Sequence, residues 1–288
     1  MPMNSKRCHF LLFAVLVSCT LLASAEVKRS HSDQDLRAVG HRKIASHDRN
    51  LYSPQAEQEV GKQEAIAIEK NEKLLSDSVV DDGIAKLLAL ISQHSDAHPP
   101  ISLKVIDSEE SYSVSLPGGY EYVSRGLLMR LEDESQLASF LAREIAHQSL
   151  HSAARQRSRE QLAQMASIPM IFIGQNTNAT NVAVPLTLLN WKRQDELDAD
   201  YFGIQYLYLA GYDPRSFVEM VNRIWQNRGQ DSQPQAFERW PPLDQRTIAL
   251  NDELAAFPTR PAEHVTAPIC DFNQLHAHLQ RVGSISDK

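Results

Sequence analysis

Apolar residues recur along most of this chain at the spacing of helices. From Val79 to Ile91 they gather on one side of a helix that ends before Pro99-Pro100. Ser53-Pro54 marks another helix start, because serine caps the first turn and proline is tolerated there. The pattern predicts further helices over about 54–75, 134–159, 182–210, 214–227, 242–256 and 273–281.

Two stretches alternate like strands. Residues 101–107 read "ISLKVID", and residues 111–128 read "SYSVSLPGGYEYVSRGLL" with a turn at Pro117-Gly118-Gly119 between two short strands. Paired glycines let a backbone approach another group without obstruction by side chains, so we expect these strands to lie close to the site that they serve. The fold class is therefore predicted to be mostly α with a small sheet (α+β).

The N-terminus has the order of a secretory signal. Lys6 and Arg7 precede an apolar run over 10–22 and then Ala23-Ser24-Ala25, which predicts a signal peptide over 1–25. The run is too short for a convincing membrane anchor. An alternative stays open, because residues 16–19 also fit the cleavage site of a bacterial lipoprotein acylated on Cys19. Export to the periplasm or cell envelope is predicted in either case.

The rest of the chain divides into three parts. Residues 26–50 are polar and lack apolar periodicity, which predicts a flexible leader. Residues 51–256 form the main domain, and residues 257–288 are expected to be a tail that packs on it. The segment 165–174, "MASIPMIFIG", is apolar but too short to cross a bilayer, so it is expected either to contact a membrane surface or partner, or to cover a cleft.

Charge and cysteine content narrow the function. Removal of the signal takes away two basic residues and lowers the formal net charge from −7 to −9. An acidic chain argues against a nucleic-acid partner. Of Cys8, Cys19 and Cys270 only the last lies outside the signal, so no disulfide framework is expected.

The segment "LAREIAHQSLH", residues 141–151, differs by one letter from a zinc protease motif. In H-E-x-x-H two histidines four residues apart bind zinc from one helix face, and the glutamate polarises the bound water. Here the positions hold Arg143, Glu144 and His147. The segment 195–203, "DELDADYFG", offers Glu196 as a third ligand from a second helix and Asp200 to orient a neighbour.

Several motifs in one order resemble the zinc metallopeptidases of family M48, especially exported bacterial members. They are "DLRAVGHRKI", "LYSPQAEQEVGKQ", the strand pair, "ESQLASFLAREIAH", "DELDADYFGIQYLYLAGYDPRSF" and "PPLDQR". The resemblance as a whole runs from about Asp35 to Arg281. The resemblance implies a gluzincin-type, zincin-like domain, mostly helical, with a small sheet edge that pairs with an extended substrate. That edge would be the strand residues Leu116, Pro117, Gly118, Gly119 and Tyr120.

The resemblance also implies roles for single residues. His147 and Glu196 stand where two zinc ligands belong, Glu144 stands where the general base belongs, and Asp200 and Arg246 stand where supporting residues belong. Two ligand positions depart from the family. Arg143 replaces the first histidine, and a guanidinium has only donors and cannot coordinate a cation.

The second departure is Trp240, where family members often carry a histidine before Pro-Pro. An indole nitrogen donates and does not ligate. Because catalytic zinc takes three protein ligands, we expect zinc binding to be weak or absent. The leading hypothesis is that Arg143 replaces the charge of the metal by pairing with Glu196 or Glu144. A rival is a shifted site built from His147 and His151, in which Gln148 would stand at the base position.

Two functions follow from these observations. The favoured one is a pseudopeptidase, or impaired peptidase, of the cell envelope that binds extended or misfolded polypeptides. The alternative is an active zinc metalloendopeptidase of envelope protein quality control with Glu144 as its general base. Both have polypeptides as substrate or client.

Overall fold

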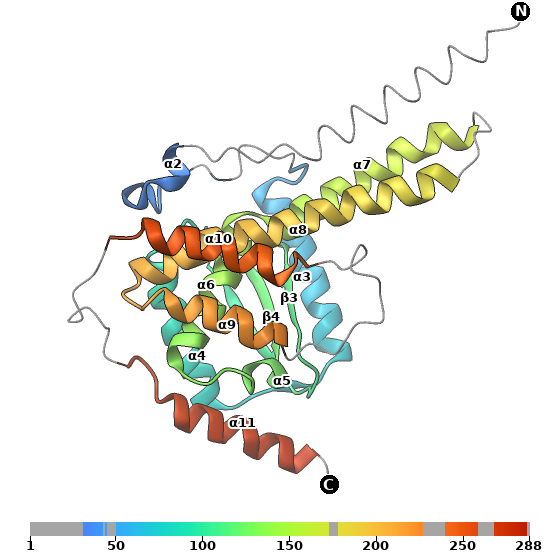
Figure 1. The fold of residues 1–288 in the computed structure, drawn as a ribbon. Coiled ribbons are helices and arrows are strands. Elements are labelled where there is room, and N and C mark those ends of the chain that lie inside the picture. The colour runs from blue at the N-terminus through green and yellow to red at the C-terminus, as the bar shows by residue number, and fades with distance from the viewer. Residues whose placement is uncertain are drawn as a thin grey trace, which may run out of the picture.

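The structure is a computed structural model. It describes residues 31–42, 44, 50–98, 100–172, 178–226, 240–258 and 268–286, without the side chains of 31–32, 165–172, 178–188, 225–226 and 283–286 (Figure 1). The predicted signal peptide over 1–25 lies outside these residues. Within them, none of the helices combines the length and apolarity that crossing a bilayer requires.

A small mixed sheet confirms the predicted strands and adds one. Its strands are β1 (Leu74–Leu75), β2 (Ser102–Ile106), β3 (Ser113–Leu116) and β4 (Tyr120–Ser124), in the order β1-β2-β4-β3. β2 and β4 are parallel, whereas β1 pairs with β2 and β3 pairs with β4 in antiparallel fashion. The short helix η3 (Pro117–Gly119) forms the turn between β3 and β4. This order leaves β3 at one edge of the sheet.

Helices make up most of the remaining described chain, which confirms the mostly α, α+β class. The short helical turns are α2 (His31–Gln34), η1 (Leu36–Ala38) and α5 (Arg125–Leu128). The longer helices are α3 (Pro54–Asn71), α4 (Ser78–Ser92), α6 (Glu134–Ser149), α7 (Ser152–Phe172), α8 (Asn178–Leu209), α9 (Arg215–Gln226), α10 (Leu243–Ala256) and α11 (Phe272–Ser286). Figure 1 shows α7 and α8 side by side, extending away from the body of the domain.

The predicted helix over 134–159 is in fact two helices, α6 and α7. The break is at His151, whose φ of 50° lies in the left-handed region that a non-glycine residue rarely adopts. Helical periodicity therefore does not continue through the break, and His151 does not share a helix face with His147.

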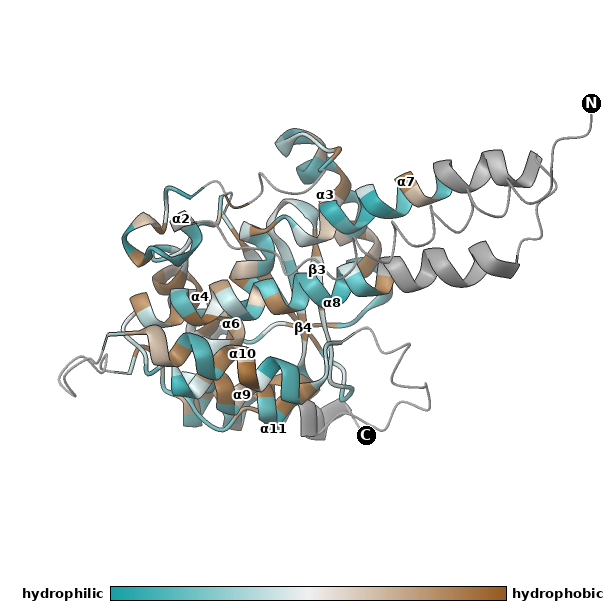
Figure 2. Cartoon of the chain, turned by 45° about the horizontal axis from the view of Figure 1, so that its top comes forward, coloured by the Kyte–Doolittle hydropathy of each residue, from teal (hydrophilic) through white to brown (hydrophobic). Residues whose placement is uncertain are grey.

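The centre of the domain is α6, in which every residue from Gln136 to Ser149 is buried. It packs against α8, α9 and α4, and Leu137, Leu141 and Ile145 belong to the main hydrophobic core as predicted. The opposite face of α6, with Arg143 and His147, is buried as well. Outer helices are different: α3 and the described part of α7 are mostly hydrophilic (Figure 2).

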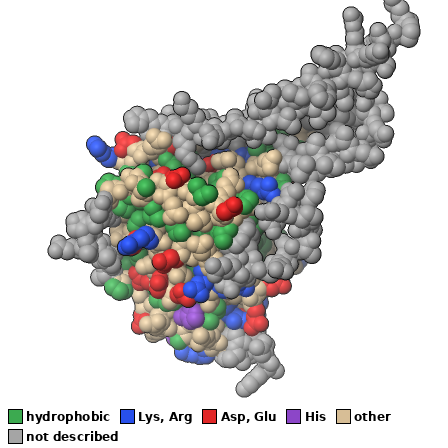
Figure 3. All heavy atoms as spheres, in the orientation of Figure 1, with side chains coloured by type: hydrophobic (Ala, Val, Ile, Leu, Met, Phe, Trp, Pro, Cys, Tyr) green, Lys and Arg blue, Asp and Glu red, His purple; other side chains and the backbone are tan. Residues whose placement is uncertain are grey.

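Both flanking segments pack on the domain. Leu275 and Leu279 of α11 are buried against α4 in the main core. In the leader, Ile44 joins the same core and Arg42 is buried. In the described leader residues 31–42 and 44, contact with the domain is therefore made by buried polar side chains together with Ile44. On the face seen in Figure 3, basic and acidic side chains are interspersed rather than separated by sign.

Candidate functional site

Three helices bring the predicted site residues together. α6 supplies Arg143, Glu144 and His147, and α8 supplies Glu196 and Asp200. α10 supplies a further basic residue, Arg246. Each of these six side chains belongs to a residue that is at most 9% exposed. The spacing on α6 explains the first group, because residues three and four apart share a helix face.

The guanidinium of Arg143 lies among three carboxylates. Its Nη1 donates to Glu144 Oε1 at 3.0 Å, its Nη2 donates to Glu196 Oε2, and its Nε donates to Asp200 Oδ1 at 3.3 Å. The Arg143 side chain is 7% exposed, so water screens these contacts little. Arg143 therefore pairs with both glutamates that the sequence suggested as alternatives.

Asp200 also binds a second guanidinium. Arg246 donates to it through Nε at 2.7 Å and Nη2 at 2.8 Å, which is the parallel two-bond geometry that favours arginine and carboxylate pairs. The ring of Trp240 lies over Arg143, with its centroid 5.3 Å from the guanidinium carbon. Trp240 thus contacts the cation by its aromatic face.

Burial and charge act in opposite directions on these groups. Burial raises the pKa of Glu144, and the positive charge of Arg143 opposes that rise. Burial likewise lowers the pKa of Arg143, while Glu144 raises it. Arginine nevertheless remains protonated at any working pH. The pair is therefore an ion pair whose two charges compensate each other's loss of hydration.

The residues present do not fit a zinc ion in this arrangement. His147 Nε2 and Glu196 Oε2 lie 3.8 Å apart and are the two ligand types that remain, but the third position holds the donor groups of Arg143. In the described part of the chain, no three His, Cys, Asp or Glu side chains are grouped to hold a metal ion. Catalytic zinc needs three such ligands.

The shifted site is not formed either. His151 lies beyond the end of α6, and its Nδ1 is 2.8 Å from Glu57 Oε2 on α3. Gln148 is turned toward the sheet, away from the role of a base. Its amide nitrogen donates to Ser115 Oγ and to the Leu116 carbonyl at 3.0 Å each, and its oxygen accepts from Gly119 N at 3.0 Å.

Glu121 is a buried acid that our sequence analysis missed. It lies on β4 and is 1% exposed, and it accepts hydrogen bonds from Gln148 and Ser115. Burial raises its pKa well above the ordinary value, and the charge of Glu144 adds to that rise. Strand alternation could have found it, because Glu121 shares a face of β4 with the fully buried Val123.

The glycines of the turn before β4 approach other backbone segments of the domain closely. Gly118 and Gly119 have φ of 77° and 91°, and a Cβ on Gly118 would lie 2.6 Å from Gln58 Cα of α3. A Cβ on Gly119 would lie 2.7 Å from the Pro100 carbonyl oxygen. These glycines therefore permit close packing within the domain. Of the neighbouring segment Leu116 to Tyr120, none lines the cavity beside Arg143.

Two cavities flank Arg143. One, of about 130 Å³, is polar and is lined by residues that include Ser113, Ser115, Glu144, His147, Lys192 and Glu196. The other, of about 60 Å³, is mostly apolar and is lined by residues that include Tyr112, Leu127, Phe140, Met220, Val221 and Ile224. Arg143, Trp240 and Ser113 line both cavities. Ser113 and Ser115 belong to β3, so the cavities lie along the edge strand.

Known proteins resemble part of this chain. A Vibrio cholerae protein named as a candidate beta-barrel assembly-enhancing protease is 27% identical over 65% of this chain and 42% of its own length. The beta-barrel assembly-enhancing protease of Escherichia coli is 25% identical over 61% of this chain and 39% of its own length. Mitochondrial metalloendopeptidase OMA1 of Schizosaccharomyces pombe is 30% identical over 52% and 45%.

The match thus spans less than half the length of each of these relatives. A family profile extends the comparison beyond single proteins. The profile described as Peptidase family M48 matches residues 81–254, which hold β2 to β4 and all six site residues. That range is more than half of the chain, and the protein therefore belongs to peptidase family M48.

Proposed function

We propose that this protein is a pseudopeptidase of its family, which binds extended or misfolded polypeptide segments without zinc and without cleaving them. The observation that carries the proposal is the guanidinium of Arg143, which contacts Glu144, Glu196 and Asp200 at once. A fixed cation in that position supplies the charge that a metal would otherwise supply to the same acids.

Energetics support this role for Arg143. An unpaired carboxylate in a protein interior is costly, and breaking a buried ion pair destabilises a protein by about 3–5 kcal/mol. Glu144 and Glu196 have side chains that are 2% and 11% exposed, so both need a cation nearby. Arg143 satisfies that need within the chain. For zinc to bind, Arg143 would have to leave both glutamates.

The sheet edge supports binding of an extended segment. Within the described chain β3 pairs with β4 on one side and has no strand on its other side. A polypeptide added there would form backbone hydrogen bonds, and its side chains would alternate in direction. The polar and apolar cavities both reach Ser113 of β3, so each can receive a side chain from such a segment.

An active zinc metalloendopeptidase is the competing function. It is favoured by the convergence of Glu144, His147 and Glu196 on one cavity and by the peptidase names of the relatives. In that case Glu144 would be the general base. Coordination chemistry argues against it, because two ligands remain where three are required.

We further propose that the protein acts in the cell envelope. The predicted signal over 1–25 and the names of the bacterial relatives, which refer to β-barrel assembly, support this location. Acylation at Cys19 is the lipoprotein form of the same proposal. Membrane contact through 165–174 also stays a prediction, since the side chains of that segment lie outside the described residues.

Metal analysis combined with a binding assay tests the proposal. The full chain, purified after growth with zinc, is expected to contain far less than one zinc per molecule and to bind fluorescein-labelled casein equally with and without EDTA. No casein fragments are expected. One tightly held zinc per chain, with cleavage abolished by EDTA and by Glu144→Gln, would establish the peptidase instead.

A paired substitution provides the matched control. Arg143→His with Trp240→His restores imidazoles at both departing positions, and it is expected to gain one zinc per chain. If this variant folds but binds no zinc, the assignment of Arg143 and Trp240 to ligand positions is wrong.

A further inference from the structure

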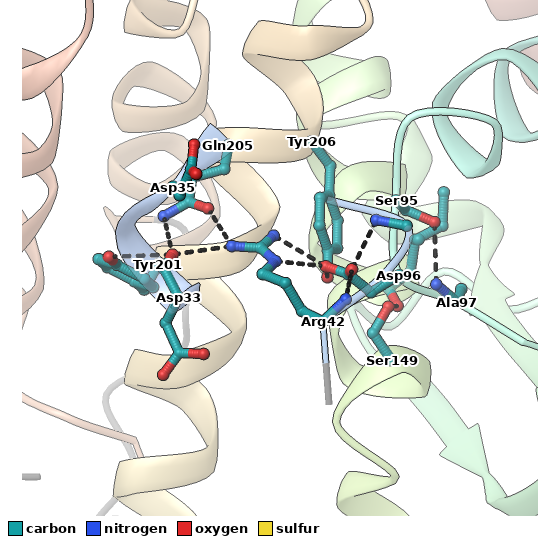
Figure 4. Close-up of polar contacts among 12 residues, drawn as sticks. Asp33, Asp35, Arg42, Ser95, Asp96, Ala97, Ser149, Tyr201, Gln205 and Tyr206 are labelled. Carbon is teal, nitrogen blue, oxygen red and sulfur yellow. Dashed lines mark hydrogen bonds and ion pairs between the residues drawn. The ribbon is translucent and has the colours of Figure 1, made fainter. Parts of the chain in front are cut away.

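A second buried arginine, Arg42, lies at the centre of another polar cluster. Its Nε donates to Asp96 Oδ2 at 2.9 Å, and its Nη1 donates to Gln205 Oε1 and to the Asp33 carbonyl oxygen at 2.8 Å each. Figure 4 shows the guanidinium reaching between these three groups. The Arg42 side chain is 0% exposed. The leader is thus attached by a fully desolvated cation.

This cluster ties together the helices that also build the candidate site. Gln205 on α8 donates to Glu253 on α10 at 2.8 Å. Tyr206 on α8 donates to Asp96 at 2.9 Å (Figure 4), and α8 in turn packs along α6. Arg42 therefore binds Gln205 of α8 directly and Asp96 beside it, and through α8 these contacts are connected to α10 and α6.

The two clusters are close along each helix. On α8, Asp200 and Gln205 are five residues apart, which is about 7.5 Å of helix. On α10, Arg246 and Glu253 are seven residues apart, or about 10.5 Å. α8 and α10 are consequently joined at two neighbouring points, by Asp200 with Arg246 and by Gln205 with Glu253.

We propose that Arg42 is a positioning residue for the candidate site. By holding Asp96 and Gln205 it fixes α8 and α10 against α6, at the spacing that brings Glu196 and Asp200 to Arg143. The residue lies before the region that the family profile matches, 81–254. A leader segment outside that region thereby helps to set the geometry of the site inside it.

Hydrogen exchange of the full chain tests the proposal. Arg42→Met keeps the length of the side chain and removes its charge and donors. It is expected to accelerate amide exchange at least tenfold in the turns of α8 and α10 that carry Glu196, Asp200 and Arg246. Arg125→Met is the matched control, because Arg125 pairs with buried Asp107, and neither residue has a hydrogen bond or ion pair to α6, α8 or α10 among the described contacts.

Casein binding provides a second readout. Arg42→Met is expected to weaken it about tenfold and Arg125→Met to leave it unchanged. This readout rests on the proposed function, whereas hydrogen exchange does not, so failure of casein binding in the unsubstituted chain would count against that function alone. Equal exchange at the site in both variants, at comparable loss of stability, would overturn the positioning role.

A conservative variant keeps the test decisive if Arg42→Met does not fold. Arg42→Lys retains the charge but has one donor group in place of the planar fork. It is expected to accelerate exchange in the same turns of α8 and α10 by about threefold. Exchange indistinguishable from that of the unsubstituted chain would show that the fork of Arg42 does not position the helices.

Discussion

Removal of the central cation is the most direct perturbation of the site. In Arg143→Met the replacement is apolar and of similar length, so the main loss is electrostatic. Asp200 keeps its two hydrogen bonds from Arg246, but Glu144 and Glu196 lose the guanidinium. The substitution thus leaves two buried carboxylates without the cation that Arg143 provides.

The size of the effect follows from that geometry. Breaking one buried pair by removing a single partner costs about 3–5 kcal/mol. Two pairs share the same guanidinium, and both glutamates can relieve the cost by taking up a proton, so the contributions do not add. We expect Arg143→Met to lower the free energy of unfolding by about 3–5 kcal/mol at pH 8, a large part of the ~5–15 kcal/mol typical of a domain.

Urea unfolding followed by circular dichroism measures this loss. A double-mutant cycle with Glu196→Gln isolates the pair, because the coupling energy excludes effects of each substitution alone. We expect Glu196→Gln to recover at least 1 kcal/mol in the Arg143→Met background and to destabilise the unsubstituted chain. Arg223→Met is the surface control, since Arg223 pairs with Glu132 at side-chain exposures of 38% and 52% and should cost under about 1 kcal/mol.

Two results would refute the reasoning. One is a loss below about 1 kcal/mol for Arg143→Met, similar to that of the surface control. The other is a coupling energy near zero between Arg143 and Glu196. Either result would mean that the acids are neutral or solvated in solution, and that Arg143 does not stand in for a metal.

Three further predictions concern other parts of the domain. Burial raises the pKa of Glu121 in the folded chain, so the unfolded chain loses this proton at a lower pH, and Glu121→Gln should gain stability relative to the unsubstituted chain as pH rises above the ordinary range of a glutamate. Urea unfolding of both chains between about pH 4 and about pH 8 measures this effect. A difference in unfolding free energy that does not increase with pH would contradict the prediction. Gly118→Ala should cost about 2–4 kcal/mol from its φ and the contact with Gln58, whereas Gly40→Ala, with a similarly positive φ of 87° but only an ordinary van der Waals contact to the Ser95 carbonyl oxygen at 3.8 Å, should cost about 1–2 kcal/mol by thermal unfolding. Burial and the charge of Glu134 raise the pKa of Cys270 to about 12, so its thiol should react with iodoacetamide at pH 8 at least a hundredfold more slowly than free cysteine; a comparable rate excludes the raised pKa.

Local pattern was enough to predict the helices and the strand pair. Apolar spacing located α4 and α6, and serine before proline located the start of α3, where Ser53 accepts a hydrogen bond from Ala56 N. The break at His151 was missed because neither glycine nor proline marks it in the sequence. Glu57, which lies 94 residues earlier in the chain, contacts the imidazole at that junction.

The site was predictable where chemistry restricts residue type. The identity of Arg143 alone excluded a third zinc ligand there, and the neighbouring acids suggested its pairing. Polar contacts between distant segments were not predictable. Gln148 binds the turn at Gly119, and Arg42 binds Asp96, which lies 54 residues later in the chain. Such contacts could not be predicted because the positions of amide and guanidinium side chains follow no periodic pattern in a sequence.

The length of β3 limits how tightly any segment can be held. Four residues at a sheet edge offer only a handful of outward main-chain groups, and each hydrogen bond contributes about 1 kcal/mol net. A total near 4 kcal/mol corresponds to a dissociation constant of about 1 mM. Contacts of that strength form and release quickly, so lasting retention of a client would depend on several weak attachments acting together.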